Sequence, residues 1–565
     1  MPHSPRRTTL FALFLALAHS LAAQTPTQQQ LDQLTSSQDW PTVVRLIGPL
    51  SPRTANQDFI YATALAHLDR LPEAERVFHE GGRLAPRDPR FPTELAGIAF
   101  TQKRYPQAGQ LLRQALRIAP NDSYANDFLG TVYFLEGNIP SALKYWNRVQ
   151  KPHLAEIQTD SALRISPVLL DNAFAFAPAT TLTLPQYLDS AARVRGLGIY
   201  PQPRFDLRAL PDGNFDLNFR GAEKNGFGDT KLEALVQFFS ELPFQGVTPD
   251  YFNLRKEAIN FTSLLRWDAQ KRRASADLSG PIEHRAKYRY DFNLDLRNEN
   301  WALRNGFAGP APVLASLNLR TERVAGTLKS FSGDRFRWTF GAELSHRDER
   351  GAVPGSILNS NLLASGYQLK QLAQVGSSLL RVPEHRFTLS AEAGTEAARL
   401  WSSPSKSSEK LVGALLSHWL PQSLGDDYAL QQSLRVGKTF GQVPFDELFM
   451  LGLERDNDLP LRAHIGTRDG IKGSAPLGRN YVLYSWEIDK NLYGNGLVAL
   501  KIGPFLDTGA INDPGTSLGS HKWLTDVGGQ MKFRVFSTNV AFSYGKDLRS
   551  GNNAFYLTLL PQPED

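Results

Sequence analysis

The five residues from Gly515 to Gly519 read GTSLG and match the Gly-x-Ser-x-Gly pattern of a hydrolase nucleophile elbow. That chemistry needs a strand before the serine and a helix after it. Here the segment follows AINDP and leads into SHKWL, which predicts a turn, so we interpret the match as a coincidence. The chain has no cysteine, and its 11 histidines show no HExxH pattern and no ligand-like spacing. The sequence therefore predicts no enzyme activity, no bound metal and no cofactor.

A strict alternation of apolar and polar residues marks the segment YRYDFNLDLR, residues 288–297. Successive side chains of a strand face opposite sides of a sheet. One face of this strand is therefore apolar, with Tyr288, Tyr290 and Phe292 at its start, and the other face is charged or polar. The apolar face contacts either the core of a soluble sandwich or the lipid of a membrane, and the rest of the chain must decide between them.

The N-terminus predicts export. Arg6 and Arg7 precede an apolar run from Leu10 to Ala18, and small residues follow it, which is typical of a secretory signal peptide over residues 1–23. No later segment has about twenty consecutive apolar residues, so a membrane could be entered only as a β-barrel. The 565 residues carry 62 basic and 56 acidic side chains, a formal net charge of +6, and no long basic run that would predict nucleic-acid binding.

Residues 24–150 contain a repeat with a period of 34 residues. Small, bulky and proline positions keep one register, at Ala62, Ala74, Phe78, Pro86, Ala96, Ala108, Leu112, Pro120, Gly130, Ala142 and Trp146. Small residues let paired helices approach closely, and the bulky position fills the space beside the next repeat. This register resembles the tetratricopeptide repeat, which stacks helical hairpins into an array. A generic array of helical hairpins is the alternative.

Residues 151–224 read as strand, helix, helix, strand, strand. The last two strands, PRFDLRAL and NFDLNFRGAEK, are joined by the turn tripeptide Pro211-Asp212-Gly213. This order resembles the polypeptide-transport-associated (POTRA) domain, and any small α+β domain is the alternative.

From residue 225 onward, apolar and polar residues alternate in strand-like runs, at 335–346, 386–397, 428–440, 481–492 and 533–545.

The 341 residues of 225–565 accommodate about sixteen membrane strands at roughly ten residues each plus turns. A soluble sandwich alternates too. Export, a length beyond one sandwich domain, and unlike charges on the polar face, such as Arg289 beside Asp291, favour an outer-membrane β-barrel with a water-filled lumen. The predicted fold class is a helical repeat array, one α+β domain and a C-terminal antiparallel transmembrane β-barrel.

Roughly residues 151–565 resemble the superfamily of POTRA-plus-barrel outer-membrane proteins, which holds the barrel-assembly insertases, the translocation-and-assembly proteins and the two-partner secretion transporters. The resemblance rests on Phe505-Leu506-Asp507-Thr508-Gly509, which fits the family's F-x-D-x-G strand, and on Leu461-Arg462-Ala463-His464, which lies where the family has an Arg-Gly-aromatic loop tip. The resemblance implies that Arg462 folds into the lumen and pairs with acidic residues of the wall, Asp507 and Glu487. Glycine and an aromatic residue are replaced by Ala463 and His464, so the tip is expected to be shaped differently.

Two functions follow from these patterns. The first is a protein-handling barrel in the bacterial outer membrane that inserts or translocates β-rich or unfolded client proteins. Its periplasmic repeats and POTRA-like domain would bind clients or a periplasmic partner, and its barrel would contact outer-membrane lipid. The alternative is a passive outer-membrane pore with a periplasmic scaffold, in which the pair of Arg462 and Asp507 merely closes the pore.

Overall fold

The computed structural model describes residues 26–560, apart from 161, 229, 305–311, 354–361, 422–426, 495–497, 514–517 and 536–537. The predicted signal peptide and most of the GTSLG segment lie outside the described residues. The chain divides into two compact units, Met1–Glu136 and Gly137–Asp565. Among the described residues, no helix has the length and apolar character needed to cross a membrane.

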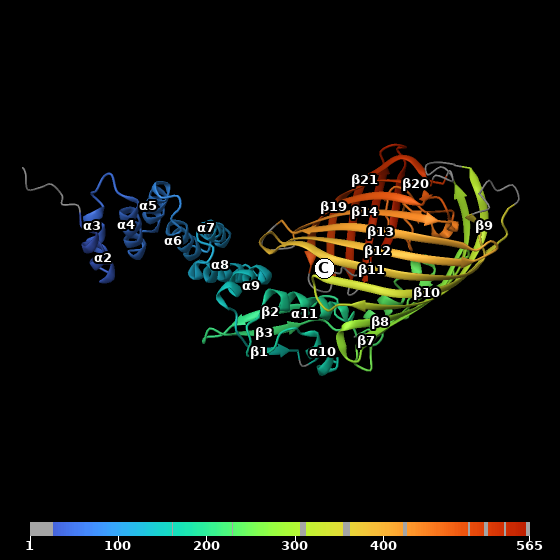
Figure 1. Cartoon of the computed structure of the whole chain (residues 1–565), viewed down its shortest axis with the longest axis horizontal. Coiled ribbons are helices and arrows are strands. Elements are labelled where there is room, and N and C mark those ends of the chain that lie inside the picture. The colour runs from blue at the N-terminus through green and yellow to red at the C-terminus, as the bar shows by residue number, and fades with distance from the viewer. Residues whose placement is uncertain are drawn as a thin grey trace, which may run out of the picture. The chain divides into compact units, whose positions relative to one another are not determined.

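The first unit is an array of helices (Figure 1). They are α2 (Gln28–Ser36), α3 (Trp40–Ile47), α4 (Ala55–His67), α5 (Leu71–Leu84), α6 (Arg90–Thr101), α7 (Tyr105–Ile118) and α8 (Ser123–Leu135). Helix α4 packs on α5, and α6 packs on α7. The register positions in these helices are buried, at Ala62, Ala74, Phe78, Ala96, Ala108, Leu112 and Gly130. Pro86 and Pro120 lie exposed just after α5 and α7, where each hairpin ends.

A second set of prolines keeps the same period at the other end of these helices. Pro72 and Pro106 occupy the first turn of α5 and α7. Proline is tolerated there because the first N–H groups of a helix have no partner within it. The predicted helical array with a tetratricopeptide register is therefore confirmed in fold, with a start signal and a stop signal in each repeat.

The second unit begins with α9 (Ile139–Trp146) and η1 (Asn147–Val149), where Ala142 and Trp146 are buried. The predicted α+β order then follows as β1 (Leu154–Thr159), α10 (Pro167–Ala173), α11 (Leu184–Gly196), β2 (Arg204–Ala209) and β3 (Phe215–Arg220). The sheet has the order β1-β3-β2, with β1 parallel to β3 and β2 antiparallel to it. Packed aromatic rings, among them Phe174, Phe205 and Phe219, fill the space between helices and sheet.

Most of the remaining strands form a closed barrel (Figure 1). Its members are β4 (Gly246–Val247), β5 (Tyr251–Leu254), β6 (Ile259–Arg266), β7 (Lys271–Ile282), β8 (Arg285–Arg304), β9 (Val313–Ser330), β10 (Phe336–Arg350), β11 (Gly366–Val382), β12 (Phe387–Trp401), β13 (Lys406–Trp419), β14 (Tyr428–Gly441), β16 (Thr467–Arg468), β17 (Ile471–Lys472), β19 (Asn480–Gly494), β20 (Val498–Asn512), β21 (Ser520–Val535), β22 (Thr538–Asp547) and β23 (Asn553–Leu560). Within the described residues, fourteen of these strands have eight residues or more, and four have two to four. The expected number of about sixteen lies between the fourteen long strands and the total of eighteen strands in the described residues.

The two faces of the barrel wall differ in chemistry, as the alternation predicts. On β8, Phe292 is 58% exposed on the outside, whereas Asp295 is 4% exposed on the inside. The same exposed apolar face continues around the wall, at Leu294, Leu296, Val324, Phe340, Leu344, Leu369, Val375, Leu411, Leu415, Val436, Ile502, Met531 and Phe542. The predicted antiparallel barrel is confirmed as a fold.

One part of the strand prediction is wrong. Residues 231–238 form the helix α12, and Leu242–Phe244 form the 3-10 turn η2, where strands and loops were expected from residue 225 onward. The local signal for a helix was present, because the Thr230 hydroxyl accepts a hydrogen bond from the Glu233 N–H and caps the first turn. The module limits drawn from the sequence after residues 150 and 224 stay predictions.

Segment 137–224 contacts successive turns at one end of the barrel. The Ser166 N–H donates to the Lys256 carbonyl in the turn before β6, and Asn172 donates to the His284 carbonyl before β8. Arg193 donates to the Ser332 carbonyl before β10. Before β12, the 3-10 turn η4 (Pro383–His385) holds Glu384, which pairs with Lys144 at 2.6 Å. These contacts attach the α+β domain and α9 to this end of the barrel.

Candidate functional site

The candidate site is the inward loop, which we define as residues 442–479 between β14 and β19. It contains η5 (Phe445–Glu447), β15 (Phe449–Met450), the short barrel strands β16 and β17, and β18 (Leu477–Gly478). Its charged side chains pair with inward-facing residues of three separate parts of the barrel wall. The lumen is therefore crossed by a loop with several anchors.

The first anchor is Arg462 at the tip of the loop. Its Nε donates to Asp507 Oδ2 at 2.7 Å and its Nη2 donates to Asp507 Oδ1 at 2.8 Å, which is a bidentate pair. Its Nη1 donates to Glu487 Oε2 at 3.0 Å and to Gln530 Oε1 at 2.8 Å. Arg462 is 7% exposed and Asp507 is fully buried. The guanidinium thus binds β19, β20 and β21 together.

Phe505 and two glycines shape the slot that receives the tip. The Arg462 guanidinium carbon lies 3.8 Å from the centre of the Phe505 ring, which is 2% exposed. Phe505 faces inward, on the same side as Asp507, and supports the guanidinium by a cation–π contact. A Cβ atom at Gly545 would lie 2.5 Å from the Arg462 carbonyl oxygen, and one at Gly528 would lie 2.7 Å from the Phe505 ring. The missing side chains therefore let the loop lie directly against the wall.

The two replaced residues of the tip bind the wall as well. The Ala463 N–H donates to Asp526 Oδ2 at 2.6 Å, and His464 Nδ1 lies 3.0 Å from the same oxygen. His464 Nε2 lies 3.8 Å from Asp547 Oδ2. Ala463 does not adopt a positive φ angle. The tip therefore takes a shape that needs no glycine at this position, and His464 adds a polar contact that an aromatic hydrocarbon ring could not make.

A second anchor lies on β6, β7 and β8. Asp456 of the loop forms ion pairs with three arginines of the wall. Its carboxylate oxygens lie 2.5 Å from a guanidinium nitrogen of Arg273, 3.4 Å from one of Arg297 and 3.8 Å from one of Arg266. Lys472 of the loop pairs with Glu299 of β8 at 2.6 Å. These side chains are at most 17% exposed, so the charges of the loop and of the wall compensate one another in a partly shielded environment.

A third anchor lies on β10, β11 and β13. Glu447 of η5 forms ion pairs with three basic residues of the wall. Its carboxylate oxygens lie 3.0 Å from a nitrogen of Arg347, 3.1 Å from Lys370 Nζ and 2.8 Å from Lys410 Nζ. Arg347 is 1% exposed and also binds Asp446 at 3.0 Å. An apolar cluster that includes Phe445 and Leu448 packs beside these ion pairs. The root of the loop is thus fixed by both packing and charge.

Sequence reasoning named part of this site and missed the rest. The structure brings Arg462, Asp507, Glu487 and Phe505 together, and Gly509 lies where a Cβ would be 2.7 Å from the Val482 carbonyl oxygen. The missed residues include the carboxylates Asp526 and Asp547 and the acidic loop residues Glu447, Glu454 and Asp456. The sequence did carry one signal for Asp526 and Asp547, because each lies near a glycine on a strand near the C-terminus. Only the pairing register shows that they reach the tip.

No family model matches the chain, and no curated protein matches it. Among solved structures, the chain resembles BamA from Haemophilus ducreyi lacking POTRA domains 1–3, at 11% identity and a TM-score of 0.40, over 72% of this chain and 83% of that one. It also resembles CdiB from Escherichia coli, at 11% identity and a TM-score of 0.44, over 73% and 75%. MamA from Desulfovibrio magneticus RS-1 matches 21% of this chain and 70% of its own, at 16% identity and a TM-score of 0.21.

Proposed function

We propose that this chain is an outer-membrane β-barrel that inserts or translocates client proteins, with its helical repeats and POTRA-like domain in the periplasm. The observation that carries the proposal is the inward loop, which closes the lumen through ion pairs on three parts of the wall. The ion pairs of such a loop can exchange partners, while the apolar cluster around Phe445 and Leu448 keeps its root in place. No covalent chemistry is required.

The geometry favours this function over a passive pore. A pore for small solutes needs an unobstructed lumen, whereas here Arg462 contacts β20 while Asp456 contacts β7 and β8 on another part of the wall. The ion pairs do more than line a channel, because each joins the loop to the wall. The buried bidentate pair at Arg462 is a costly feature to maintain unless the loop position has a function.

The soluble modules offer surfaces for extended or helical polypeptides. Strand β2 lies at an edge of the three-stranded sheet, and its residues Arg204, Asp206 and Arg208 are exposed. An edge strand can pair with the backbone of a client, which gives affinity with little sequence dependence. Stacked helical hairpins present a groove suited to a segment of a client or partner.

The placement of segment 137–224 follows from the turns that it contacts. It contacts the turns before β6, β8, β10 and β12, so it lies at one end of the barrel. If the exposed apolar belt lies in the membrane, this end faces one compartment. We propose that this compartment is the periplasm, because outer-membrane barrels carry their short turns on that side and the turns before β8 and β12 are short.

Depletion of the chain in its own cells tests the function. The expected result is the loss of a set of outer-membrane or secreted proteins from quantitative envelope and medium proteomes, with rescue by the wild-type gene. The variant Arg462→Ala, at wild-type barrel abundance, is expected to rescue poorly. Unchanged proteomes together with altered uptake of small solutes would support the passive pore instead.

A further inference from the structure

A row of three aspartates crosses neighbouring strands at the point where the loop tip binds. In the strand register Asp507 of β20 lies opposite Asp526 of β21, and Asp526 lies opposite Asp547 of β22. All three are at most 3% exposed. Like charges directly opposite each other on a sheet repel. A buried row of this kind needs compensating positive charge from elsewhere.

The loop compensates only one end of this row fully. Arg462 binds both oxygens of Asp507. Asp547 accepts hydrogen bonds from the backbone of Arg549 and Ser550 in its own turn. Asp526, which is fully buried, contacts the Ala463 N–H and His464 Nδ1 through its Oδ2, and its Oδ1 has no hydrogen-bond partner among the residues that the structure describes. An unsatisfied buried carboxylate oxygen is costly, so something that binds it would stabilise the docked tip.

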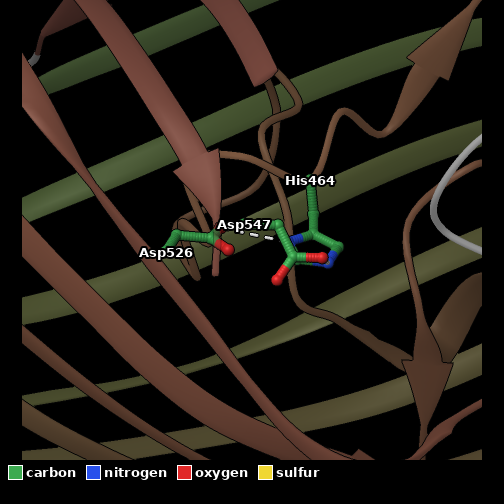
Figure 2. Close-up of side chains that lie close together, drawn as sticks. All are labelled: His464, Asp526 and Asp547. Atoms are coloured by element: carbon green, nitrogen blue, oxygen red, sulfur yellow. Dashed lines mark hydrogen bonds and ion pairs between the residues drawn. The ribbon is translucent and has the colours of Figure 1, made fainter. Parts of the chain in front are cut away.

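Figure 2 shows the carboxyl groups of Asp526 and Asp547 beside the ring of His464. One donor atom from each of these three residues can be chosen so that all lie within 4.8 Å of one another. Ligand atoms around a tetrahedral zinc ion, bound at about 2.0–2.2 Å, lie roughly 3.3–3.5 Å apart. To reach coordination distance, the three donors would have to move closer together by side-chain rotation, with one of the two ring nitrogens of His464 turned toward both carboxylates.

We propose that His464, Asp526 and Asp547 bind a divalent transition-metal ion of the zinc class. The neutral imidazole would supply one nitrogen, and each aspartate would supply one oxygen, which is a donor set that zinc accepts. Two positive charges would offset two opposed carboxylates, one of which has an oxygen with no hydrogen-bond partner among the described residues. The three ligands come from the loop, β21 and β22, so the ion joins the loop tip to the wall.

The residue spacing in the sequence could not have indicated this site. His464 lies 62 residues before Asp526, and only the sheet register and the inward loop bring the two together. The site is independent of the proposed function, since it requires only the docked tip. It also gives the replacement of an aromatic residue by His464 a chemical consequence.

Zinc binding by the full-length chain in detergent tests the proposal. The protein is treated with a chelator, dialysed against zinc chloride and analysed by elemental mass spectrometry and competition titration. We expect one zinc ion per chain for the wild type. In His464→Phe and Asp547→Asn we expect an affinity at least about tenfold weaker, since even loss of an outer-shell partner costs 10–100-fold. His346→Phe, a histidine of the same barrel on β10, is the matched control and should bind zinc like the wild type.

A second measurement keeps the test decisive if a variant does not fold. Cobalt added to the metal-free wild type should give a visible absorption band typical of nitrogen and oxygen ligands, and zinc should remove it. Absence of the band together with no zinc uptake by the folded wild type would overturn the proposal and leave His464 as an ion-pair partner. Equal zinc binding by a folded His464→Phe variant would overturn it as well.

Discussion

At the scale of single residues, the question is why an arginine occupies the loop tip. Arg462 has carboxylate oxygens on two strands, an amide oxygen on a third and an aromatic ring beneath its guanidinium. A planar guanidinium that stays charged when buried can make all of these contacts at once, and an ammonium group cannot. Lysine at this position would therefore keep the charge and lose the bidentate geometry.

This geometry predicts strong coupling between Arg462 and Asp507. Arg462→Ala leaves the buried Asp507 carboxylate without its main partner, whereas Glu487 keeps Lys532 at 2.6 Å. The change should cost about 3–5 kcal/mol of barrel stability. A double-mutant cycle with Asp507→Ala, measured as the unfolding midpoint from heat-modified gel mobility, should show a coupling of about 1–3 kcal/mol. The exposed pair of Arg320 and Glu322 on the same barrel is the control, with an expected coupling of about 0–1 kcal/mol. Strict additivity at Arg462 and Asp507 would mean that the loop tip does not dock in solution.

The tip shows how far residue patterns can predict a site. The F-x-D-x-G strand and the loop arginine were visible in the sequence because they are contiguous motifs, and the structure places them in contact. The contact of Asp526 and Asp547 with the tip was not visible in the sequence, because it depends on the pairing register of the strands. A slip of one residue in this register would turn every side chain of a strand to the opposite face. The different shape expected for the tip follows from alanine's poor access to a positive φ angle. Ala463 has no positive φ angle, and Gly545 on the wall gives the tip room for its close approach.

At the scale of elements, the orientation of β8 predicts that the same substitution has different effects at the adjacent positions Phe292 and Asn293. Phe292 is 58% exposed on the outer face, and Asn293 faces the lumen. A charge on a lipid-facing position costs about 2–4 kcal/mol near the middle of a bilayer. Phe292→Arg should therefore reduce the amount of folded barrel recovered in membranes, and Asn293→Arg should be tolerated, as read by heat-modified mobility. Equal losses from the two variants would contradict the assignment of faces.

The ion pair between α9 and the turn η4 gives a pH-dependent contact outside the strands. Burial alone would raise the pKa of Glu384, but hydrogen bonds from Lys144 and Tyr145 outweigh it and hold the pKa below its usual value. A lowered folded pKa gives stability that is present above the unfolded pKa and is lost as pH falls through the folded one. Glu384→Gln should thus lower stability by about 1–3 kcal/mol at pH 7. The difference should shrink below about pH 4, near the ordinary pKa of glutamate. Thermal unfolding of both proteins across this pH range checks the sign, and a constant difference at all pH values would contradict it.

Elements were predictable where one period dominated a long segment. The 34-residue register and the two-residue alternation each repeat many times, so single exceptions do not hide them. Helix α12 was missed because it is only eight residues long and interrupts a strand-rich region. The inward loop was expected from a motif, but its anchors at Asp456 and Glu447 depend on contacts with strands far away in the sequence.

At the scale of the whole molecule, the outer surface of the barrel determines in which solvent the folded barrel can be kept dispersed. Its exposed leucine, valine and phenylalanine side chains continue over most of the long strands. Soluble monomers rarely expose a continuous apolar surface of more than a few hundred Å². By contrast, the helical array and the α+β domain bury their apolar registers, at positions such as Ala74, Leu112 and Phe219.

We therefore expect a fragment of residues 24–224 to be folded and monomeric in buffer, and a fragment of residues 225–565 to require detergent. Segment 137–224 contacts the barrel through hydrogen bonds, an ion pair and the packing of Gly196 on Phe331. Its own aromatic core of Phe174, Phe205 and Phe219 lies within the segment, so cutting after residue 224 should leave both parts folded. Circular dichroism and analytical ultracentrifugation test the first fragment. Heat-modified mobility after refolding into micelles tests the second, with the same protein diluted into detergent-free buffer as its control. A monodisperse, folded 225–565 fragment without detergent would show that the apolar belt does not face lipid, and the proposed outer-membrane function would fail with it.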